Sequence, residues 1–218
     1  KKDSTENDKS FLVKTCALLI HAAKIDENYT EKEEEIIKKT LLELGAKKEN
    51  ITNIAKVFLN SDPEFRCCEL FAKPARTGLP SPNHQDNYYW AVKGGNAITL
   101  WIALNNSNKN NGCVHYYDGS HKYGILEHEA SFAKGSSQKI SNTNFLKKFK
   151  ISYPELRPGD ALVHHSLVVH GSSKNNSLNN RRGWTIQFKD KNASYDLEQI
   201  KAYEKSLNNQ IQLRSQSY

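Results

Sequence analysis

The chain has 218 residues, of which 37% are hydrophobic and 25% are charged, so it is long enough to bury a hydrophobic core in one or two domains. Its longest apolar runs are about five residues, as in Cys16–Ile20, whereas a membrane-spanning helix needs roughly 20. The net charge is +7, but the basic residues form no stripe interleaved with aromatic residues, so we expect neither a membrane nor a nucleic-acid partner.

The basic excess lies entirely beyond residue 60, because the first 60 residues hold 11 lysines and 11 acidic residues. This distribution favours an anionic small molecule as the ligand of the second part. The four cysteines have neither a zinc spacing nor the density of a secreted disulfide scaffold, which predicts reduced thiols and a cytoplasmic location. The chain contains no methionine, so we expect the sequence to be incomplete.

Residues 1–60 are predicted to form a helical segment. Apolar side chains recur at three- and four-residue steps within residues 11–23 and again within residues 36–44, and a third short helix is expected near residues 50–59. The stretch over residues 21–33 resembles the TerB-like family of tellurite-resistance helical proteins, and it contains no catalytic motif.

Residues 61–218 are predicted to form a second, antiparallel all-β domain. A closing helix is expected over residues 196–214, packed on the outside of the sheet. Short β-type runs separated by Gly, Pro, Asn and Asp carry this prediction: Cys67–Ala72, Ala97–Leu104, Cys113–Tyr117, Ala161–His170 and Trp184–Phe188.

The residue types and their spacing in this domain indicate a metal site. Alternate residues of an extended segment point to one side, so His84 and Asp86 are placed to ligate one ion. A β-type run downstream ends at His170, and two histidines with one carboxylate suit iron(II) with open positions for other ligands. Arg181 follows 11 residues after that histidine, and its planar fork suits a carboxylate.

Several neighbouring residues offer alternative interpretations. His84 and Asp86 can instead belong to a surface loop without a ligand. In one continuous strand His164 faces the same side as His170, so it is a rival ligand, although His170 is favoured because it lies at the strand end. Arg182 is the rival of Arg181, and only one of the two can enter the pocket because adjacent strand residues face opposite sides.

The second domain resembles the phytanoyl-CoA dioxygenase family of iron(II)- and 2-oxoglutarate-dependent oxygenases over about residues 63–218. The resemblance rests on an ordered series of motifs: Lys73-Pro74, Pro82-Asn-His84-Gln-Asp86, Tyr88-Tyr89-Trp90, Trp101-Ile-Ala-Leu104, Asn111-Gly112-Cys113, Gly119-Ser120-His121-Lys122, Pro158-Gly159-Asp160, His170-Gly-Ser172, Asn175, Ser177 and Arg181.

This resemblance implies a mainly β fold, a double-stranded β-helix of the jelly-roll, cupin-like type, with the N-terminal helical segment and the C-terminal helix added to it. It implies that His84, Asp86 and His170 are the catalytic iron(II) ligands. Family members carry a longer N-terminal region that supplies sheet strands, and here a helical stretch stands in its place. Strands are therefore either missing from the sequence or replaced by another arrangement.

The resemblance also implies a cosubstrate and a substrate pocket. Arg181 matches the residue that holds the remote carboxylate of 2-oxoglutarate, and Ser172 and Trp101 match positions that line the same cosubstrate. Asn87 and Tyr88, which follow the ligands directly, are the expected substrate-binding residues.

The predicted activity is therefore that of a dioxygenase that uses O2 and 2-oxoglutarate to hydroxylate a small, anionic organic substrate, with release of succinate and CO2. The carboxylate of Asp86 favours hydroxylation over halogenation, in which related enzymes replace that ligand by a small residue. The alternative is a non-catalytic, cupin-like metal- or ligand-binding module whose helical segment binds a partner. A zinc hydrolase ranks last because it leaves Arg181 unexplained. No feature of the sequence predicts the oligomeric state.

Overall fold

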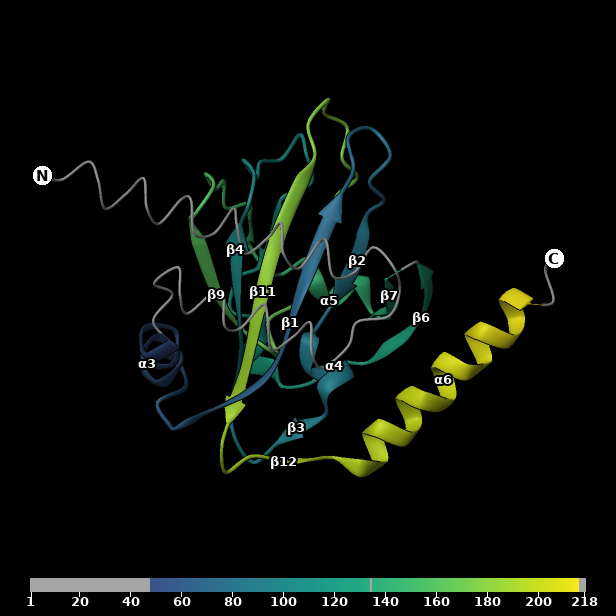
Figure 1. Cartoon of the computed structure of the whole chain (residues 1–218). Coiled ribbons are helices and arrows are strands. Elements are labelled where there is room, and N and C mark those ends of the chain that lie inside the picture. The colour runs from purple at the N-terminus through teal and green to yellow at the C-terminus, as the bar shows by residue number, and fades with distance from the viewer. Residues whose placement is uncertain (1–47, 134, 216–218) are drawn as a thin grey trace, which may run out of the picture.

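The computed structural model describes residues 48–133 and 135–215, and it places two four-stranded antiparallel sheets against each other (Figure 1). Two packed antiparallel sheets are the arrangement of a jelly roll, so the mainly β, cupin-like fold expected from the sequence is confirmed. The helices expected within residues 11–44 lie outside the described residues.

The strands form two main layers and two smaller pairs. The main sheet, in spatial order, consists of β1 (Pro63–Lys73), β11 (Arg181–Asp190), β4 (Ala97–Ala103) and β9 (Ala161–His165). The minor sheet consists of β2 (Ser81–His84), β10 (His170–Ser172), β5 (Val114–Tyr117) and β8 (Ile151–Ser152). The smaller pairs are β3 (Val92–Lys93) with β12 (Ser194–Tyr195), and β6 (His128–Ala133) with β7 (Ser136–Ile140).

Five helices accompany the sheets in the described part of the chain: α3 (Lys48–Leu59), α4 (Asp86–Trp90), the 3-10 helix η1 (Ser120–Tyr123), α5 (Thr143–Leu146) and α6 (Leu197–Ser215). The short helix expected near residues 50–59 is confirmed as α3. None of these helices has the length and apolar character that crossing a membrane requires.

The hydrophobic core is divided between the two faces of the main sheet. Because successive strand residues point to opposite sides, one set from β4 and β11 packs outward under α3, and the alternate set faces the minor sheet. The outer cluster contains Ala55, Leu59, Ile98, Leu100, Leu104, Trp184, Ile186 and Phe188. The cluster between the sheets contains Trp101, Ala103, Val114, Tyr116 and Val168. Other inward positions are polar, such as Thr99, Thr185 and Gln187, and these line the cavity described below.

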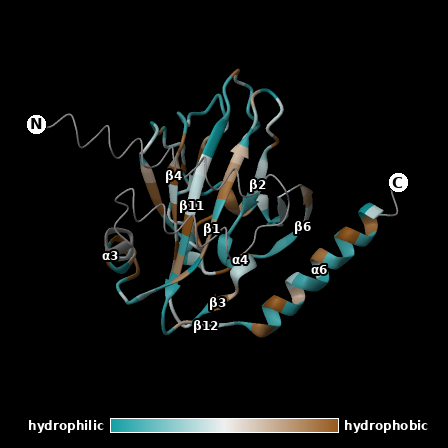
Figure 2. Ribbon diagram, in the orientation of Figure 1, coloured by the Kyte–Doolittle hydropathy of each residue, from teal (hydrophilic) through white to brown (hydrophobic). Residues whose placement is uncertain are grey.

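The predicted closing helix is present as α6, but it packs against α4 and β6 instead of the outside of the main sheet, and it runs away from the sheets (Figure 1). Hydrophobic residues are spread along α6 between hydrophilic ones (Figure 2), and several remain exposed, such as Leu197 and Ile211. Polar contacts hold this helix: Gln199 Nε2 donates to the carbonyl oxygens of Asn87 and Tyr88 at 2.9 and 2.8 Å.

Two local predictions differ from the structure. The run Ala161–His170 is broken after His165, where a turn carries the chain from β9 in the main sheet to β10 in the minor sheet. The segment from His84 to Asp86 is not extended throughout, because His84 ends β2 and Asp86 begins α4. Both changes bring the chain to the edge between the sheets, where the candidate site lies.

Candidate metal centre and cosubstrate pocket

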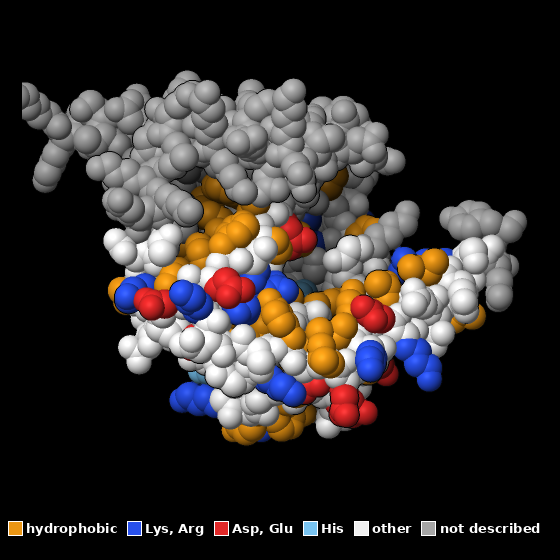
Figure 3. Space-filling view, turned by 60° about the horizontal axis from the view of Figure 1, so that its bottom comes forward, with side chains coloured by type: hydrophobic (Ala, Val, Ile, Leu, Met, Phe, Trp, Pro, Cys, Tyr) orange, Lys and Arg blue, Asp and Glu red, His pale blue; other side chains and the backbone are white. Residues whose placement is uncertain are grey.

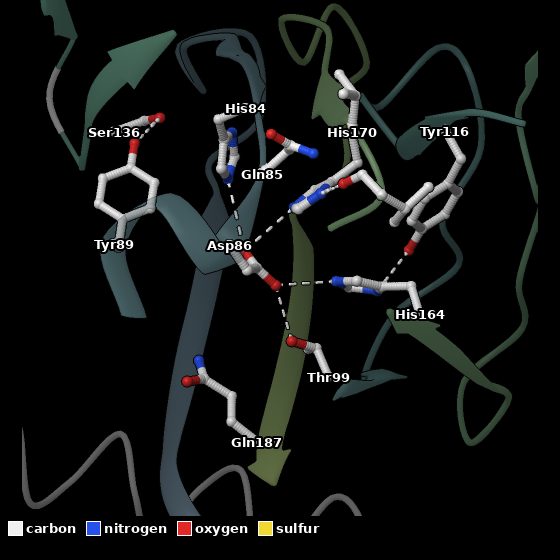
Figure 4. Close-up of polar contacts among 12 residues, drawn as sticks. His84, Gln85, Asp86, Tyr89, Thr99, Tyr116, Ser136, His164, His170 and Gln187 are labelled. Carbon is white, nitrogen blue, oxygen red and sulfur yellow. Dashed lines mark hydrogen bonds and ion pairs between the residues drawn. The ribbon is translucent and has the colours of Figure 1, made fainter. Parts of the chain in front are cut away.

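Three side chains with metal-ligating atoms meet where the minor sheet adjoins α4 (Figure 4). Pairing of β2 with β10 sets His84 opposite His170. The Nε2 atoms of these histidines lie 3.7 and 3.5 Å from Oδ1 of Asp86. One ligand atom from each of the three residues lies within 4.8 Å of the other two, so the structure brings together the three ligands predicted from the sequence.

The residue between two of these ligands anchors the turn that positions them. Gln85 is fully buried, and its side-chain amide donates to the carbonyl oxygens of Gly124 and Leu167 at 2.8 and 2.6 Å. Its carbonyl oxygen accepts from the backbone N–H of Leu126 at 2.7 Å. Because these buried polar atoms are paired, Gln85 holds the junction between β2 and α4 in one conformation.

The two histidines present the form of imidazole that a metal requires. His84 Nδ1 lies 2.7 Å from the carbonyl oxygen of Pro82, and His170 Nδ1 lies 3.1 Å from that of Val168. A carbonyl oxygen only accepts, so each Nδ1 carries a hydrogen, and Nε2 is the nitrogen that faces Asp86 and is placed for a metal. This second hydrogen bond is the usual way in which a protein orients a ligating histidine.

The protonation states of the cluster also suit a cation. Burial lowers the pKa of His170 to about 3, although the Asp86 carboxylate opposes this shift, so the imidazole is neutral near pH 7. Burial by itself raises the pKa of Asp86, but neighbouring imidazoles, first that of His170 and then that of His164, outweigh it and lower the pKa below its usual range. Two imidazole nitrogens and one carboxylate are a donor set that fits iron(II).

The metal centre opens into a cavity of about 900 Å³ between the two sheets and α6. Figure 3 shows this side of the molecule as a hollow with hydrophobic side chains on its rim. Trp101 and Ser172, both almost fully buried, line the cavity together with Arg181, and their contact with the cosubstrate stays a prediction. The cavity is therefore large enough for a small organic molecule beside a metal-bound one.

Two buried cations occupy one end of this cavity. Arg181 and Lys73 are cross-strand partners in β11 and β1, and they are 3% and 5% exposed. Burial lowers the pKa of Arg181 to about 10 and, aided by the nearby Arg181 charge, that of Lys73 to about 8. In the described part of the chain no carboxylate forms an ion pair with either.

The hydrogen bonds of Arg181 and Lys73 within the protein leave donor groups for an anionic ligand. Arg181 donates one bond to the backbone oxygen of Gly112 at 2.9 Å, and its Nε is buried without a partner among the described residues. Lys73 donates to the backbone oxygen of Leu79. Two buried positive charges without a counter-charge are costly, so this end of the cavity fits the carboxylates of a ligand such as 2-oxoglutarate.

The two residues expected to bind substrate do not line this cavity. The side chain of Asn87 exchanges hydrogen bonds with the backbone of Val92 at 2.9 and 3.2 Å. The ring of Tyr88 stacks on His128, with centroids 4.0 Å apart. The next residues along α4, Tyr89 and Trp90, line the cavity instead.

Three residues were missed as site residues by the sequence reasoning. Lys73 was noted only as part of a motif, and its pairing with Arg181 comes from the register of β1 and β11. Tyr89 belongs to the aromatic run Tyr88-Tyr89-Trp90, in which the sequence favours Tyr88 as the pocket residue. His164 was weighed as a rival ligand, and the structure places its Nε2 3.1 Å from Oδ2 of Asp86, on the side of the carboxylate away from His84 and His170.

The sequence matches the family model described as phytanoyl-CoA dioxygenase over residues 14–183. The chain is 28% identical over 132 residues to the peroxisomal phytanoyl-CoA dioxygenase of Bos taurus, covering 58% of this chain and 39% of that protein. It is 29% identical over 127 residues to a probable phytanoyl-CoA dioxygenase of Caenorhabditis elegans, covering 55% of this chain and 40% of that protein. The chain thus spans about two-fifths of the length of these relatives.

The fold has solved counterparts. EvdO2 from Micromonospora carbonacea var. aurantiaca, in its complex with 2-oxoglutarate, superposes with a TM-score of 0.61 at 24% identity, covering 74% of this chain and 67% of that chain. The family match begins at residue 14, inside the segment predicted to be a separate helical domain. The domain boundary near residue 60 stays a prediction.

Proposed function

The chain belongs to the phytanoyl-CoA dioxygenase family, and we propose that it is an iron(II)- and 2-oxoglutarate-dependent dioxygenase that hydroxylates a small organic substrate. The observation that carries this proposal is the juxtaposition of the His84, Asp86 and His170 cluster with two buried cations that lack a counter-charge. A metal-binding cluster alone fits many proteins, whereas the added anion site fits a cosubstrate with two carboxylates.

In this proposal His84, Asp86 and His170 hold iron(II), and Arg181 binds the remote carboxylate of 2-oxoglutarate. Trp101 and Ser172 form the walls of the cosubstrate site, and their burial keeps water away from it. The bound iron supplies activation of O2 and the oxidation of 2-oxoglutarate to succinate and CO2, coupled to hydroxylation of the substrate. The protein binds and orients the reactants and shields them from solvent.

The proposed substrate lies between the metal centre and α6 and carries an anionic group. Among the described residues, three cations line the cavity, namely Lys73, Arg181 and Arg214. The first two serve the cosubstrate in this proposal, so the exposed Arg214 of α6 is left to pair with an anionic group of the substrate, which contributes about 1 kcal/mol at most. The proposal therefore predicts a preference for anionic compounds over neutral compounds of the same shape.

The first test is anaerobic addition of iron(II) and then 2-oxoglutarate to the full chain. Chelation of the metal by the cosubstrate gives a weak visible charge-transfer band, and we expect this band to form. Absence of the band, with binding of the metal alone, identifies a non-catalytic binding module.

The second part of the test is a panel of anionic and neutral compounds, read as release of succinate under air. We expect substrate-dependent succinate release that is larger with the anionic members. A reaction that requires zinc and proceeds equally without O2 contradicts the oxygenase and supports a hydrolase. Equal succinate release with the neutral compounds contradicts only the anionic character of the substrate and leaves the oxygenase activity in the proposal.

A further inference from the structure

The two oxygens of Asp86 have different surroundings (Figure 4). Oδ1 faces the Nε2 atoms of His84 and His170. Oδ2 accepts a hydrogen bond from Thr99 Oγ1 at 2.8 Å and lies 3.1 Å from His164 Nε2. Only one oxygen of the carboxylate therefore points toward the other two ligands, and the second is bound to the protein.

Simple donor and acceptor rules orient the whole chain of hydrogen bonds behind Oδ2. An ionised carboxylate only accepts, so His164 Nε2 carries a hydrogen and donates it to Asp86. In the imidazole tautomer that donates through Nε2, the Nδ1 atom is an acceptor. The hydroxyl of Tyr116 lies 3.1 Å from this atom and is placed to donate to that tautomer. Because Nε2 of His164 already carries a hydrogen, it has no lone pair to give to a metal.

These residues come from three strands and are all removed from water. Thr99 in β4 and His164 in β9 are cross-strand partners in the main sheet, and Tyr116 in β5 is the partner of His170 in the minor sheet. Thr99 is 3% exposed, and His164 and Tyr116 are each 8% exposed. At this burial an unpaired polar atom is costly, so the hydrogen-bonded arrangement is strongly preferred over alternatives.

We propose that His164 is a positioning residue of the metal centre and not a ligand. Together with Thr99 it holds Oδ2 of Asp86, so that Oδ1 alone meets the metal, and Tyr116 fixes the tautomer of His164 that allows this. The centre thereby has three protein ligands and keeps open positions for small molecules. The inference rests on the metal centre in the proposed function, because it concerns how that centre is held.

The test is titration of the full chain with cobalt(II), which reports affinity and, through its visible d–d bands, the number of protein ligands. His164→Leu removes the donor to Oδ2, and we expect a roughly 10- to 100-fold weaker affinity, as for other residues that support metal ligands. His164→Gln places an amide N–H near the original Nε2, so we expect most of the affinity to return and the d–d bands to match the wild type.

The matched control is His165→Leu. His165 is the next residue along β9, so its side chain faces the opposite side of the sheet from that of His164; it lies 3.1 Å from Asn96 and accepts a hydrogen bond from the backbone N–H of Leu167. We expect its cobalt affinity and spectrum to equal those of the wild type. Thr99→Val is a nearly isosteric second variant that removes the other donor to Oδ2, so it tests the same idea if His164→Leu does not fold. We expect about tenfold weaker cobalt binding from it, with little change in the melting temperature without metal.

The outcomes separate the alternatives. If His164 is a ligand, His164→Gln and His164→Leu weaken binding equally, both change the d–d bands, and the inference is overturned. Wild-type affinity in both His164→Leu and Thr99→Val also overturns it, because the residues are then only structural. Failure of the wild-type chain to bind cobalt(II) or iron(II) contradicts the metal centre itself, and the proposed function falls together with this inference.

Discussion

The two ends of the cavity differ in whether the protein itself provides partners for the buried charges. At the metal centre, the carboxylate of Asp86 is held on its Oδ2 side by hydrogen bonds from Thr99 and His164, whereas Oδ1 faces the Nε2 atoms of His84 and His170. At the other end, Lys73 and Arg181 lie side by side, and no acidic residue of the described chain pairs with either.

This difference shows which part of the site is already formed in the unliganded protein. The metal centre is pre-organised, since its donors are oriented and its carboxylate is held. The cationic end carries two buried charges that only a bound anion compensates, so it destabilises the unliganded protein and favours the liganded one. Three changes separate these two roles.

The largest effect is expected from Asp86→Ala, which removes the only carboxylate of the metal cluster. We expect hydroxylation to be lost and iron(II) affinity to fall by more than the roughly 100-fold seen for residues that merely support ligands. Iron binding measured by titration and succinate release measured with substrate check this. The control is Asp118→Ala, because Asp118 is an exposed carboxylate bonded to Ser152. Retained, substrate-coupled succinate release in Asp86→Ala rejects the ligand assignment.

An intermediate effect is expected from Arg181→Lys. Lysine keeps the charge but loses the planar fork that forms two parallel bonds to a carboxylate. Loss of one charge-assisted hydrogen bond costs about 1.5–3 kcal/mol, so we expect the KM for 2-oxoglutarate to rise about 10- to 100-fold. Cobalt(II) affinity should not change, because the residue belongs to the cationic end. Arg182→Lys, at the exposed neighbouring position, should leave both quantities unchanged. A loss of metal affinity in Arg181→Lys contradicts the separation of the two ends.

The smallest effect is expected from Lys73→Met, which removes one of the two buried like charges. Burial lowers the pKa of Lys73 to about 8, so in the unliganded wild type the ammonium loses its proton as the pH rises through that value. Affinity for 2-oxoglutarate should therefore decline above pH 8 in the wild type. In Lys73→Met it should be lower, by about tenfold at pH 7, and nearly independent of pH in this range.

The free energy of unfolding of Lys73→Met provides a second test of the difference between the two ends. Removal of the buried ammonium should raise the free energy of unfolding without ligands by about 1 to 3 kcal/mol at pH 7, measured by urea denaturation. Lys174→Met, at an exposed position, provides the control for loss of a lysine. If Lys73→Met is less stable than the wild type, the buried ammonium of Lys73 does not destabilise the unliganded protein as we infer.

Much of the fold was predictable because its signals are local. The predicted run Ala97–Leu104 corresponds to β4, and the closing helix corresponds to α6. The break after His165 was not predicted, because apolar residues continue through Leu167 to Val169 and the pattern of side chains does not record a change of sheet. Similarly, nothing in the triplet from His84 to Asp86 indicates that a strand ends at His84 and that a helix begins at Asp86.

The site was predictable to the extent that its residues are marked by type and short spacing. His84, Asp86, His170 and Arg181 are brought to one cavity as expected. Asn87 and Tyr88 were chosen because they follow the ligands, but the helical turn of α4 directs Tyr89 and Trp90 into the cavity instead. A helix rotates each successive side chain by about 100°, so proximity in sequence does not decide which residue faces a pocket.

The sequence by itself determined the class of fold, and it predicted the donor atoms for a metal and the arginine for a carboxylate, because residue chemistry and local periodicity carry that information. Tertiary structure alone decided that Lys73 joins Arg181 and that His164 supports Asp86 from 78 positions away. Such contacts depend on strand register and on which sheet a strand enters. These follow from the packing of the whole chain and leave no local pattern in the order of its residues.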